Sequence, residues 1–290
     1  MNGRREGPGE LEIDEVSLGY EGRPVVDRLS AGIPRGRLVA IVGPNACGKS
    51  TLLRGMARLL TPSSGAVLLD GRAISTMPTR QVATRLGILP QHPVAPESVT
   101  VTDLVGQGRH PYRGWLRRWS PADDAAVADA MRATDTLALA DRLVDQLSGG
   151  QRQRAWIAMA LAQHTGILLL DEPTTYLDVT HQIEILDLLT DLNRASGATI
   201  VMVLHDLNLA CRYADHLLVM KDGGIVSTGR PADVITERLV AEVFALDSQV
   251  ITDPVSGGPL VVPFGRHHGG SPDPTDAFAP PSPNHGTRSE

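Results

Sequence analysis

The sequence predicts an α/β fold, in which short buried strands alternate with amphipathic helices. The main observation is a short apolar run at residues 37–43, RLVAIVG, which leads through a glycine-rich loop into a segment with helical spacing. Two more apolar runs, at 166–171 and 198–204, have the length and composition of buried strands. Continuous apolar runs are typical of strands covered on both faces, as in the sheets of α/β proteins.

The first 75 residues carry further strand and helix signals. Residues 11–20, LEIDEVSLGY, alternate apolar and polar side chains, which predicts a half-buried strand. Residues 38–60 then predict a strand, a loop and a helix, because the leucines and Met56 after the loop recur at helical spacing. Residues 65–74 predict a hairpin, with Asp70-Gly71 as its turn.

The stretch from about 92 to 146 differs in character. Prolines cluster at its start, and a helix-patterned segment follows in which Ser120 is the expected N-cap and Pro121 the first helical residue. We expect a helical insertion between two parts of the α/β core.

The second half returns to the α/β pattern. The spacing of apolar side chains in residues 180–196 predicts an amphipathic helix. Residues 216–229 predict a hairpin around Asp222-Gly223. Residues 265–290 are dense in Pro, Gly and Ser, so they are predicted to be a disordered tail.

Composition excludes several classes of protein. The chain has 290 residues, a net charge of −6 and two cysteines, which does not fit broad nucleic-acid binding or a disulfide framework. No apolar run reaches the about 18 residues of a membrane-spanning helix, and the N-terminus lacks the apolar core of a secretory signal. Lysine occurs only at Lys49 and Lys221, and Lys49 lies inside a motif.

The glycine-rich loop after the first apolar run is a phosphate-binding motif. Gly43, Gly48, Lys49 and Ser50 satisfy G-x-x-x-x-G-K-[ST], with a strand before and a helix after. Its backbone N–H groups can surround phosphate oxygens, and the helix presents its positive end to the same anion. Lys49 is expected to reach the β- and γ-phosphates of a nucleotide, and Ser50 to bind Mg²⁺.

Acidic and imidazole side chains follow the other two apolar runs. Asp171 ends one run, where a carboxylate can meet Mg²⁺, and Glu172 is placed to orient or deprotonate water. His205 ends the other, and its imidazole can donate to a phosphate oxygen. If the strands are parallel, all three motifs meet at one edge of the sheet.

A second glycine-rich turn, QLSGGQRQR at 146–154, has no nucleotide of its own to bind. Ser148 can cap a helix that begins near Gly150, and the N–H groups at that helix start can bind an anion. The residues alone leave open whether the turn is more than an N-cap.

In combination these motifs resemble the nucleotide-binding subunit of ABC transporters, over residues 10–230. The resemblance is carried by Walker A (GPNACGKST, 43–51), Walker B (ILLLDEP, 167–173), the signature (LSGGQ, 147–151), the D-loop (YLD, 176–178), Gln91 as the Q-loop glutamine, His205 as the switch histidine, and Tyr20 as the aromatic that stacks on adenine. All occur in the family's order.

The resemblance implies a P-loop ABC ATPase fold with a mixed central sheet, an N-terminal antiparallel β subdomain and an inserted helical subdomain. The expected boundaries are a flexible N-terminus at 1–9, an ATPase domain at 10–264 with its helical insertion at about 92–160, and the tail at 265–290.

The resemblance also implies a set of site residues and a metal. Nucleotide binding falls to Tyr20, Gly43, Pro44, Asn45, Ala46, Cys47, Gly48, Lys49, Ser50 and Thr51. Catalysis falls to Glu172, His205 and Gln91, and Mg²⁺ bound with ATP to Ser50, Gln91 and Asp171. Two copies pair head to tail, so that ATP on one copy is contacted in trans by the other copy's Ser148, Gly149, Gly150, Gln151 and Asp178.

Among ABC proteins, an importer ATPase fits better than the alternatives. Repair ATPases need a long coiled coil, translation factors carry two cassettes, and exporters usually fuse the cassette to spanning helices; we find none of these signs. The segment TTYLDVTHQIEILDLL resembles ferric-siderophore, haem and vitamin B12 uptake ATPases. Ferric siderophore is our first expectation for the cargo. Haem or vitamin B12 remains the alternative, and a soluble non-transport ABC ATPase a more distant one.

The implied partners are a second ATPase subunit, two permease membrane subunits and, indirectly, a substrate-binding protein, with no nucleic acid. The expected location is the cytoplasmic face of the cell membrane, as a peripheral subunit. Part of the permease groove is expected in the helical insertion, where aromatic residues alternate with arginine: Arg109, Tyr112, Arg113, Trp115, Arg117, Arg118 and Trp119.

Two residues of the phosphate loop raise further expectations. Ala46 stands where the family often has glycine, and it weakens binding if that position needs a left-handed backbone. Cys47 lies beside Lys49 and a helix start, which predicts a thiol of lowered pKa that reacts readily and that ATP protects. The alternative is that Cys47 points into the core and only fills space. Cys211 lies in LNLACRYAD, an apolar stretch that we expect to be helical, and is expected to be buried and inert.

Overall fold

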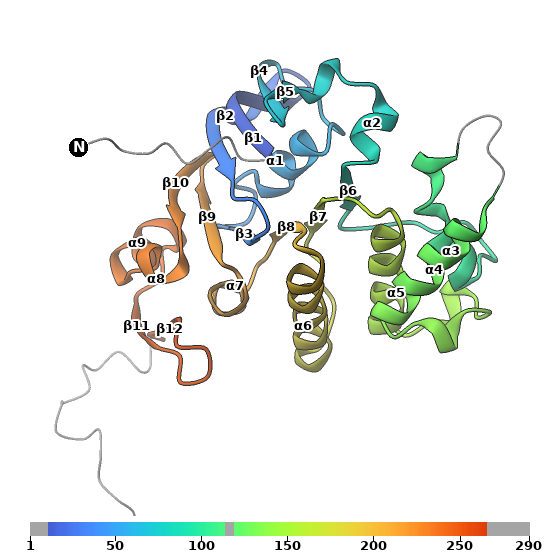
Figure 1. Cartoon of the computed structure of the whole chain (residues 1–290). Coiled ribbons are helices and arrows are strands. Elements are labelled where there is room, and N and C mark those ends of the chain that lie inside the picture. The colour runs from blue at the N-terminus through green and yellow to red at the C-terminus, as the bar shows by residue number, and fades with distance from the viewer. Residues whose placement is uncertain (1–10, 114–118, 266–290) are drawn as a thin grey trace, which may run out of the picture.

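A computed structural model describes residues 11–113 and 119–265, whose elements are arranged around one central sheet (Figure 1). The N-terminus expected at 1–9 and the tail expected at 265–290 lie, except for residue 265, outside the described residues. The helices and strands between them follow the α/β order that the sequence predicts.

The central sheet is mixed, as predicted. Its six described strands lie in the order β10 (Gly224–Gly229), β9 (His216–Lys221), β3 (Leu38–Val42), β8 (Thr199–Val203), β7 (Ile167–Asp171) and β6 (Leu86–Leu89). All are parallel to their neighbours except β10, which is antiparallel to β9. Every residue of β3, β7 and β8 is buried, which is why these strands appear in the sequence as continuous apolar runs.

The N-terminal antiparallel sheet is also confirmed. It comprises β2 (Arg23–Ile33), β1 (Leu11–Tyr20), β4 (Ser64–Leu69) and β5 (Arg72–Ala73), in that order. The alternation in β1 is interrupted at Glu15, whose φ of 46° marks a bulge, so Val16, Ser17 and Leu18 are buried in succession. Helix α1 (Lys49–Met56) packs its apolar face between this sheet and the central one.

Both predicted hairpin turns form. Asp70-Gly71 joins β4 to β5, and Asp222-Gly223 joins β9 to β10. All four residues have positive φ, between 48° and 81°. This is the backbone that a two-residue turn of type I′ requires and that Asp-Gly supplies.

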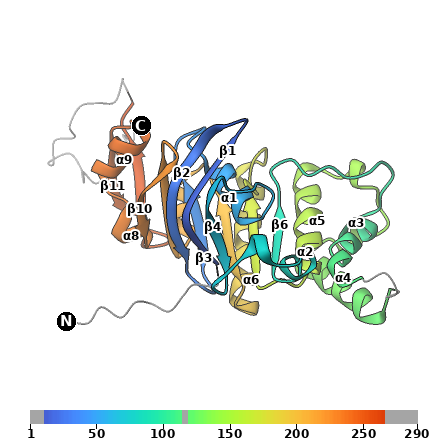
Figure 2. The same cartoon turned by 90° about the horizontal axis from the view of Figure 1, so that it is seen from above.

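The helical insertion forms a separate group at one side of the central sheet (Figure 2). It contains α3 (Val101–Gln107), α4 (Pro121–Ala133) and α5 (Gly149–Ala162), which pack on one another. Ser120 caps α4 with a reciprocal hydrogen bond to Asp123, and Pro121 is its first residue, as predicted. The short helix α2 (Thr79–Ala83) links the N-terminal sheet to β6.

A buried ion pair holds the helical group together. Arg109 Nε lies 3.0 Å from Asp123 Oδ1, and Arg109 Nη1 donates to the carbonyl of Ala162 at the end of α5. The Arg109 side chain is 8% exposed and that of Asp123 is 2% exposed. The expectation that Arg109 belongs to a permease-binding surface is therefore wrong, because its guanidinium is used inside the protein.

Breaking this pair is expected to destabilise the helical group strongly. Asp123→Ala leaves the Arg109 guanidinium buried without its carboxylate, which costs about 3–5 kcal/mol of unfolding free energy. Hydrogen bonds from Ser120, against the effect of burial, and the Arg109 contact lower the pKa of Asp123 to about 2 from 3.8. The stabilisation is therefore full above the unfolded pKa and is lost as pH falls towards 2.

Chemical denaturation of the wild type and of the Asp123→Ala variant, at pH 7 and at lower pH, measures this loss of unfolding free energy. Asp129→Ala is the matched control on the same helix, because Asp129 pairs with Arg132 at the surface and its loss should cost less than about 1 kcal/mol. Equal effects of the two substitutions would contradict a structural role for the buried pair.

The C-terminal third contains elements that the sequence analysis did not assign. Helices α6 (Val179–Ser196) and α7 (Leu207–Tyr213) were predicted; α8 (Pro231–Val234), α9 (Glu237–Phe244) and the hairpin of β11 (Ser248–Thr252) with β12 (Pro259–Pro263) were not. The hairpin lies against α7 and α9. Among residues 11–113 and 119–265, no helix has both the length and the apolar character needed to cross a membrane.

Candidate nucleotide-binding site

The predicted motifs meet at one edge of the central sheet. Strands β3, β8 and β7 are adjacent and parallel, with Ile41 and Asp171 both in register with Val203. The phosphate loop, Asp171-Glu172 and His205 follow the carboxyl ends of these strands. This is the edge at which parallel α/β sheets bind ligands.

The backbone of the phosphate loop needs its glycines. Gly43 has a φ of 155°, and a Cβ at this position would lie 2.2 Å from the carbonyl oxygen of Met220. Gly48 has a φ of 103° and immediately precedes α1, whose N-terminus has no side-chain cap. The first N–H groups of α1 therefore point into the loop without a capping side chain, which suits an anion such as a phosphate group.

Lys49 is held inside this loop. Its side chain is among the buried charged groups, with the residue 5% exposed, and its ammonium donates to the carbonyl oxygens of Gly43 at 2.8 Å and Pro44 at 2.7 Å. A buried ammonium in a ring of backbone groups is a fixed positive charge for phosphate oxygens. Asn45 is exposed, on the outer side of the loop.

Ala46 does have the left-handed backbone, with a φ of 62°. An L-residue there stores roughly 1–2 kcal/mol of strain that glycine would not. The loop thus forms in spite of the alanine, and weaker nucleotide binding remains a prediction.

The expectation for Cys47 is wrong. The residue is 5% exposed and belongs to the core cluster beneath the loop, with Val39, Ile41 and Leu52. Burial raises the pKa of Cys47, and the opposing effect of Lys49 is smaller. The side chain therefore fills space, and only the backbone of this residue can contact a nucleotide.

Cys47 is accordingly expected to react slowly with maleimides in the native protein, at a rate similar to that of Cys211. Cys211 is equally buried, and burial raises its pKa to about 12. Mass spectrometry of timed labelling, with Cys47→Ser and Cys211→Ser as controls and with unfolded protein as reference, measures both rates. Rapid labelling of Cys47 that ATP prevents would contradict its burial.

Ser50 and Asp171 form a pair suited to a magnesium ion. The Ser50 hydroxyl donates to Asp171 Oδ1 at 2.8 Å, across from the first turn of α1 to the end of β7. One hydroxyl and one carboxylate, with nucleotide phosphates as further ligands, match the oxygen ligands that Mg²⁺ prefers. Burial raises the pKa of Asp171, against the hydrogen bond from Ser50.

Glu172 lies at the centre of a hydrogen-bonded cluster. Gln91 Nε2 donates to Glu172 Oε2 at 2.5 Å, and His205 Nε2 lies 2.5 Å from Glu172 Oε1. The Thr175 hydroxyl donates to Oε2 at 3.0 Å. Sequence reasoning missed Thr175, although its place three residues after Glu172 in DEPTTYLD was a usable signal.

These contacts set the charge of Glu172. Burial by itself raises its pKa, but the hydrogen bonds from His205, Thr175 and Gln91 outweigh burial and leave the pKa below its usual value. The carboxylate is therefore ionised at neutral pH and can accept a hydrogen bond from water. Its φ of 54° is unusual for a non-glycine residue, and such strain often occurs at functional sites.

Gln91 and Tyr20 lie at the borders of this region. The Gln91 amide nitrogen bonds to Glu172, which leaves its carbonyl oxygen as the atom for a metal. Tyr20 ends β1 with its side chain partly exposed, and its hydroxyl accepts a hydrogen bond from Arg54 of α1 at 3.3 Å. An exposed ring beside α1 is available for stacking on a base.

The signature turn has the predicted N-cap. Ser148 Oγ accepts from the Gln151 N–H at 3.3 Å, and Gln151 Oε1 accepts from the Ser148 N–H at 3.2 Å. The N–H groups of Gly149 and Gly150 lie in the first turn of α5, where a helix has no internal acceptors. A Cβ at Gly150 would lie 2.4 Å from the ring of His181, so this glycine also permits α5 to approach α6.

The signature turn is part of the helical group and lies away from the phosphate loop of the same chain. Strands β8 and β7 separate β3 from β6, so three strand spacings of about 4.8 Å each lie between them. Helix α5 contacts β6 and lies beyond it (Figure 1). Asp178 of the D-loop caps α6 by accepting from the His181 N–H at 2.9 Å, with its carboxylate exposed.

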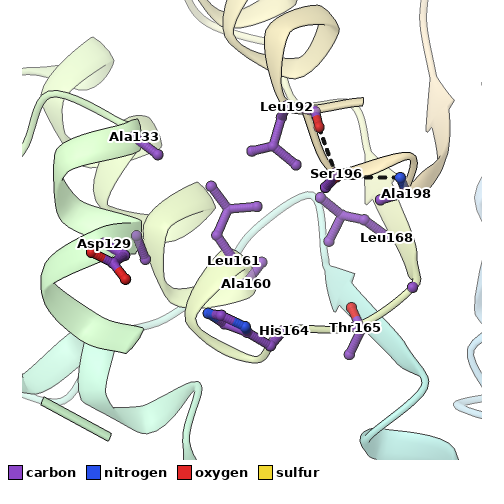
Figure 3. Close-up of a pocket in the computed structure, with 12 residues that line it drawn as sticks. Asp129, Ala133, Ala160, Leu161, His164, Thr165, Leu168, Leu192, Ser196 and Ala198 are labelled. Atoms are coloured by element: carbon purple, nitrogen blue, oxygen red, sulfur yellow. Dashed lines mark hydrogen bonds between the residues drawn. The ribbon is translucent and has the colours of Figure 1, made fainter. Parts of the chain in front are cut away.

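A cavity of about 450 Å³ lies elsewhere, between the helical group and α6 (Figure 3). Its walls include Ala133 of α4, Leu161 of α5 and Leu192 of α6. It is mostly apolar and lies beside Thr165 and Gly166, just before the start of β7 and so at the opposite edge of the sheet. The chemistry of the side chains, and not this cavity, therefore indicates the candidate nucleotide site.

Comparison with known proteins agrees with the geometry. Residues 26–175 match the family model described as ABC transporter. Among solved structures, cbiO1 from Clostridium perfringens, part of the ABC transporter complex cbiONQ, superposes with a TM-score of 0.71 at 31% identity over 81% of this chain and 94% of that one. The dimeric structure of MJ0796, a bacterial ABC transporter cassette, gives 0.67 at 28% identity over 76% and 98%.

Curated relatives are more similar in sequence. The chain is 58% identical to the "Probable siderophore transport system ATP-binding protein YusV" of Bacillus subtilis (strain 168), over 90% of this chain and 94% of that one. It is 51% identical to the ferric enterobactin transport ATP-binding protein FepC of Escherichia coli (strain K12), over 90% and 96%. This chain therefore belongs to the ABC transporter family, as one of its ATP-binding proteins.

Proposed function

We propose that this chain is the ATPase subunit of an importer that takes up ferric siderophores. The observation that carries the proposal is the 58% identity, over 90% of the chain, to an ATP-binding protein named for siderophore transport. A cobalamin import ATP-binding protein of Halobacterium salinarum (strain ATCC 29341 / DSM 671 / R1) is more distant, at 39% identity. Cobalamin is therefore the second candidate for the cargo.

The site geometry supports one division of labour. The phosphate loop and Lys49 bind the nucleotide phosphates, Ser50 and Asp171 hold Mg²⁺, and Glu172 orients or deprotonates the attacking water. Mg²⁺ supplies charge neutralisation for the phosphates when it is bound. Gln91 and His205, which both contact Glu172, link this base to the metal and to the γ-phosphate.

The assembly we infer is a homodimer on two permease subunits, at the cytoplasmic face of the membrane. The N–H groups of Gly149 and Gly150 in the signature turn and the exposed Asp178 would contact the ATP of the partner subunit. In the region expected to meet the permease, Trp119 is partly exposed beneath the guanidinium of Arg113. Trp115, Arg117 and Arg118, expected on the same surface, lie outside the described residues.

Growth and uptake measurements test the cargo. A deletion strain should fail to grow on ferric siderophore as the only iron source, lose uptake of ⁵⁵Fe-siderophore, and keep uptake of labelled cobalamin. The wild-type gene should restore uptake and the Glu172→Gln variant should not. Loss of cobalamin uptake with normal siderophore uptake would assign the other cargo, and normal uptake of both would reject the proposal.

A further inference from the structure

His205 lies between β8, from which Leu204 separates it, and helix α7, from which Asp206 separates it, so both elements set where the histidine lies. Asp206 caps the helix by accepting from the Leu209 N–H at 2.9 Å, which leaves only this one residue between His205 and the first helical residue. The helix has seven residues, far fewer than the about 12–15 that an isolated helix needs in water. Its position must therefore come from the elements packed against it.

The hairpin of β11 and β12 supplies one of these contacts through Asn208. The Asn208 Nδ2 group donates to the carbonyl of Val261 at 3.0 Å, and the Val261 N–H donates to Asn208 Oδ1 at 2.8 Å. One side chain thus uses both its donor and its acceptor on one residue of β12. This two-point contact fixes the distance and the rotation of α7 relative to the hairpin.

A second contact joins the other end of α7 to the turn of the hairpin. Arg212 Nε donates to Asp253 Oδ2 at 2.9 Å. The same carboxylate accepts from the Ser256 hydroxyl at 2.7 Å and from the Val255 N–H at 3.0 Å. Asp253 is 3% exposed. The Asp253 carboxylate is therefore held in place by the turn itself, independently of its contact with Arg212.

The His205 side chain, which precedes α7, needs accurate placement for catalysis. His205 Nε2 lies 2.5 Å from Glu172 Oε1, and the imidazole is also expected to meet the γ-phosphate. Displacement of a catalytic group by about 1 Å can cost as much as 100-fold in rate. A tilt of α7 would displace His205 while α1, which carries Lys49 and Ser50, and β7, which carries Asp171, stay in place.

We propose that Asn208 and the Arg212–Asp253 pair are positioning residues for the ATPase reaction. The C-terminal hairpin holds α7 and, through it, keeps His205 against Glu172. The inference rests on the role proposed above for His205. It assigns a function in catalysis to the β11–β12 hairpin, which lies outside the nucleotide site.

Steady-state kinetics of Asn208→Ala test this proposal. The kcat for ATP hydrolysis should fall by about 10- to 100-fold, with KM for ATP within about twofold, because the phosphate loop is untouched. Arg212→Ala should act in the same direction, and Arg212→Lys, which can still pair with Asp253, should recover part of the loss.

Asn193→Ala is the matched control. Asn193, like Asn208, bonds through its side chain to the backbone, here to the carbonyls of Gly36 and Ala198, but it lies at the end of α6. The Asn193→Ala substitution should lower the stability of the protein and leave kcat unchanged at temperatures where the variant is folded. An equal loss of kcat in both variants would mean general destabilisation and would overturn the proposal.

A double-mutant cycle separates this inference from the role of His205. In a His205→Ala background, Asn208→Ala should lower kcat no further, because the residue through which it acts is gone. An additional, multiplicative loss would overturn the positioning role while leaving the role of His205 intact. A normal kcat in His205→Ala alone would reject the role of the histidine itself.

Discussion

Glu172→Gln is expected to lower kcat for ATP hydrolysis by about 10²- to 10⁴-fold, the usual contribution of a general base. Glutamine has nearly the same shape and can still accept from the Thr175 hydroxyl, but it cannot take a proton from water. With its carbonyl oxygen opposite Thr175 and Gln91, its NH₂ group faces His205 Nε2, so a hydrogen bond donated by that nitrogen is lost. ATP affinity should change little, because Lys49 and the loop backbone are unaltered.

The same variant should accumulate as an ATP-bound dimer. ATP that binds between two copies holds them together until it is hydrolysed, so size-exclusion chromatography with Mg-ATP should show a stable dimer that wild type does not form. Glu237→Gln is the control, because the Glu237 carboxylate accepts a hydrogen bond from the Val250 N–H in the C-terminal region and makes no contact with the cluster around Glu172 among the described residues. Near wild-type turnover in Glu172→Gln would refute the assignment of the base.

Ser148→Arg and Lys49→Ala are each expected to reduce ATPase activity by at least about 100-fold, as loss of a donor to a developing oxyanion does. A mixed dimer of the two variants should recover activity, up to about half of wild type. The phosphate loop of the Ser148→Arg chain then faces the intact signature of the Lys49→Ala chain, whereas the second site carries both defects.

Crosslinking gives a second readout that does not depend on cooperation between sites. In a Cys47→Ser, Cys211→Ser background, one chain carries Ser148→Cys and the other carries Asn45→Cys, which lies on the exposed side of the loop. Because each chain has one cysteine, a bond between the two variants must join two subunits. It should form with ATP and not without it. An inactive mixed dimer with no such bond would contradict the shared site.

Much of the fold could be predicted because its signals are local. The apolar runs of β3, β7 and β8, the Asp-Gly turns and the Ser120 and Ser148 caps each depend on a few adjacent residues. The hairpin of β11 and β12 could not be predicted, because its strands are short and partly exposed and pair only with each other. The segment 237–244 did carry a signal, with Thr236 as N-cap and Leu239, Val240 and Val243 on one face.

Electrostatics could be predicted only in part, because it depends on burial. The motif places Cys47 beside Lys49 and a helix start, which by itself lowers the pKa of a thiol. Only the packed structure shows that the thiol points into the core, where loss of hydration outweighs the lysine. Arg109 was misassigned for the same reason, since its partner Asp123 lies 14 residues away on another helix.

The sequence by itself determined the chemistry of this protein: a phosphate loop, a carboxylate pair, a switch histidine and a second glycine-rich turn, because each motif is a short run whose residue types and spacing carry its function. Only the tertiary structure decided how these groups act together. Parallel strands bring Ser50 to Asp171 and His205 to Glu172 across 121 and 33 residues of chain. Such distances are set by strand order and helix packing, which no local pattern records.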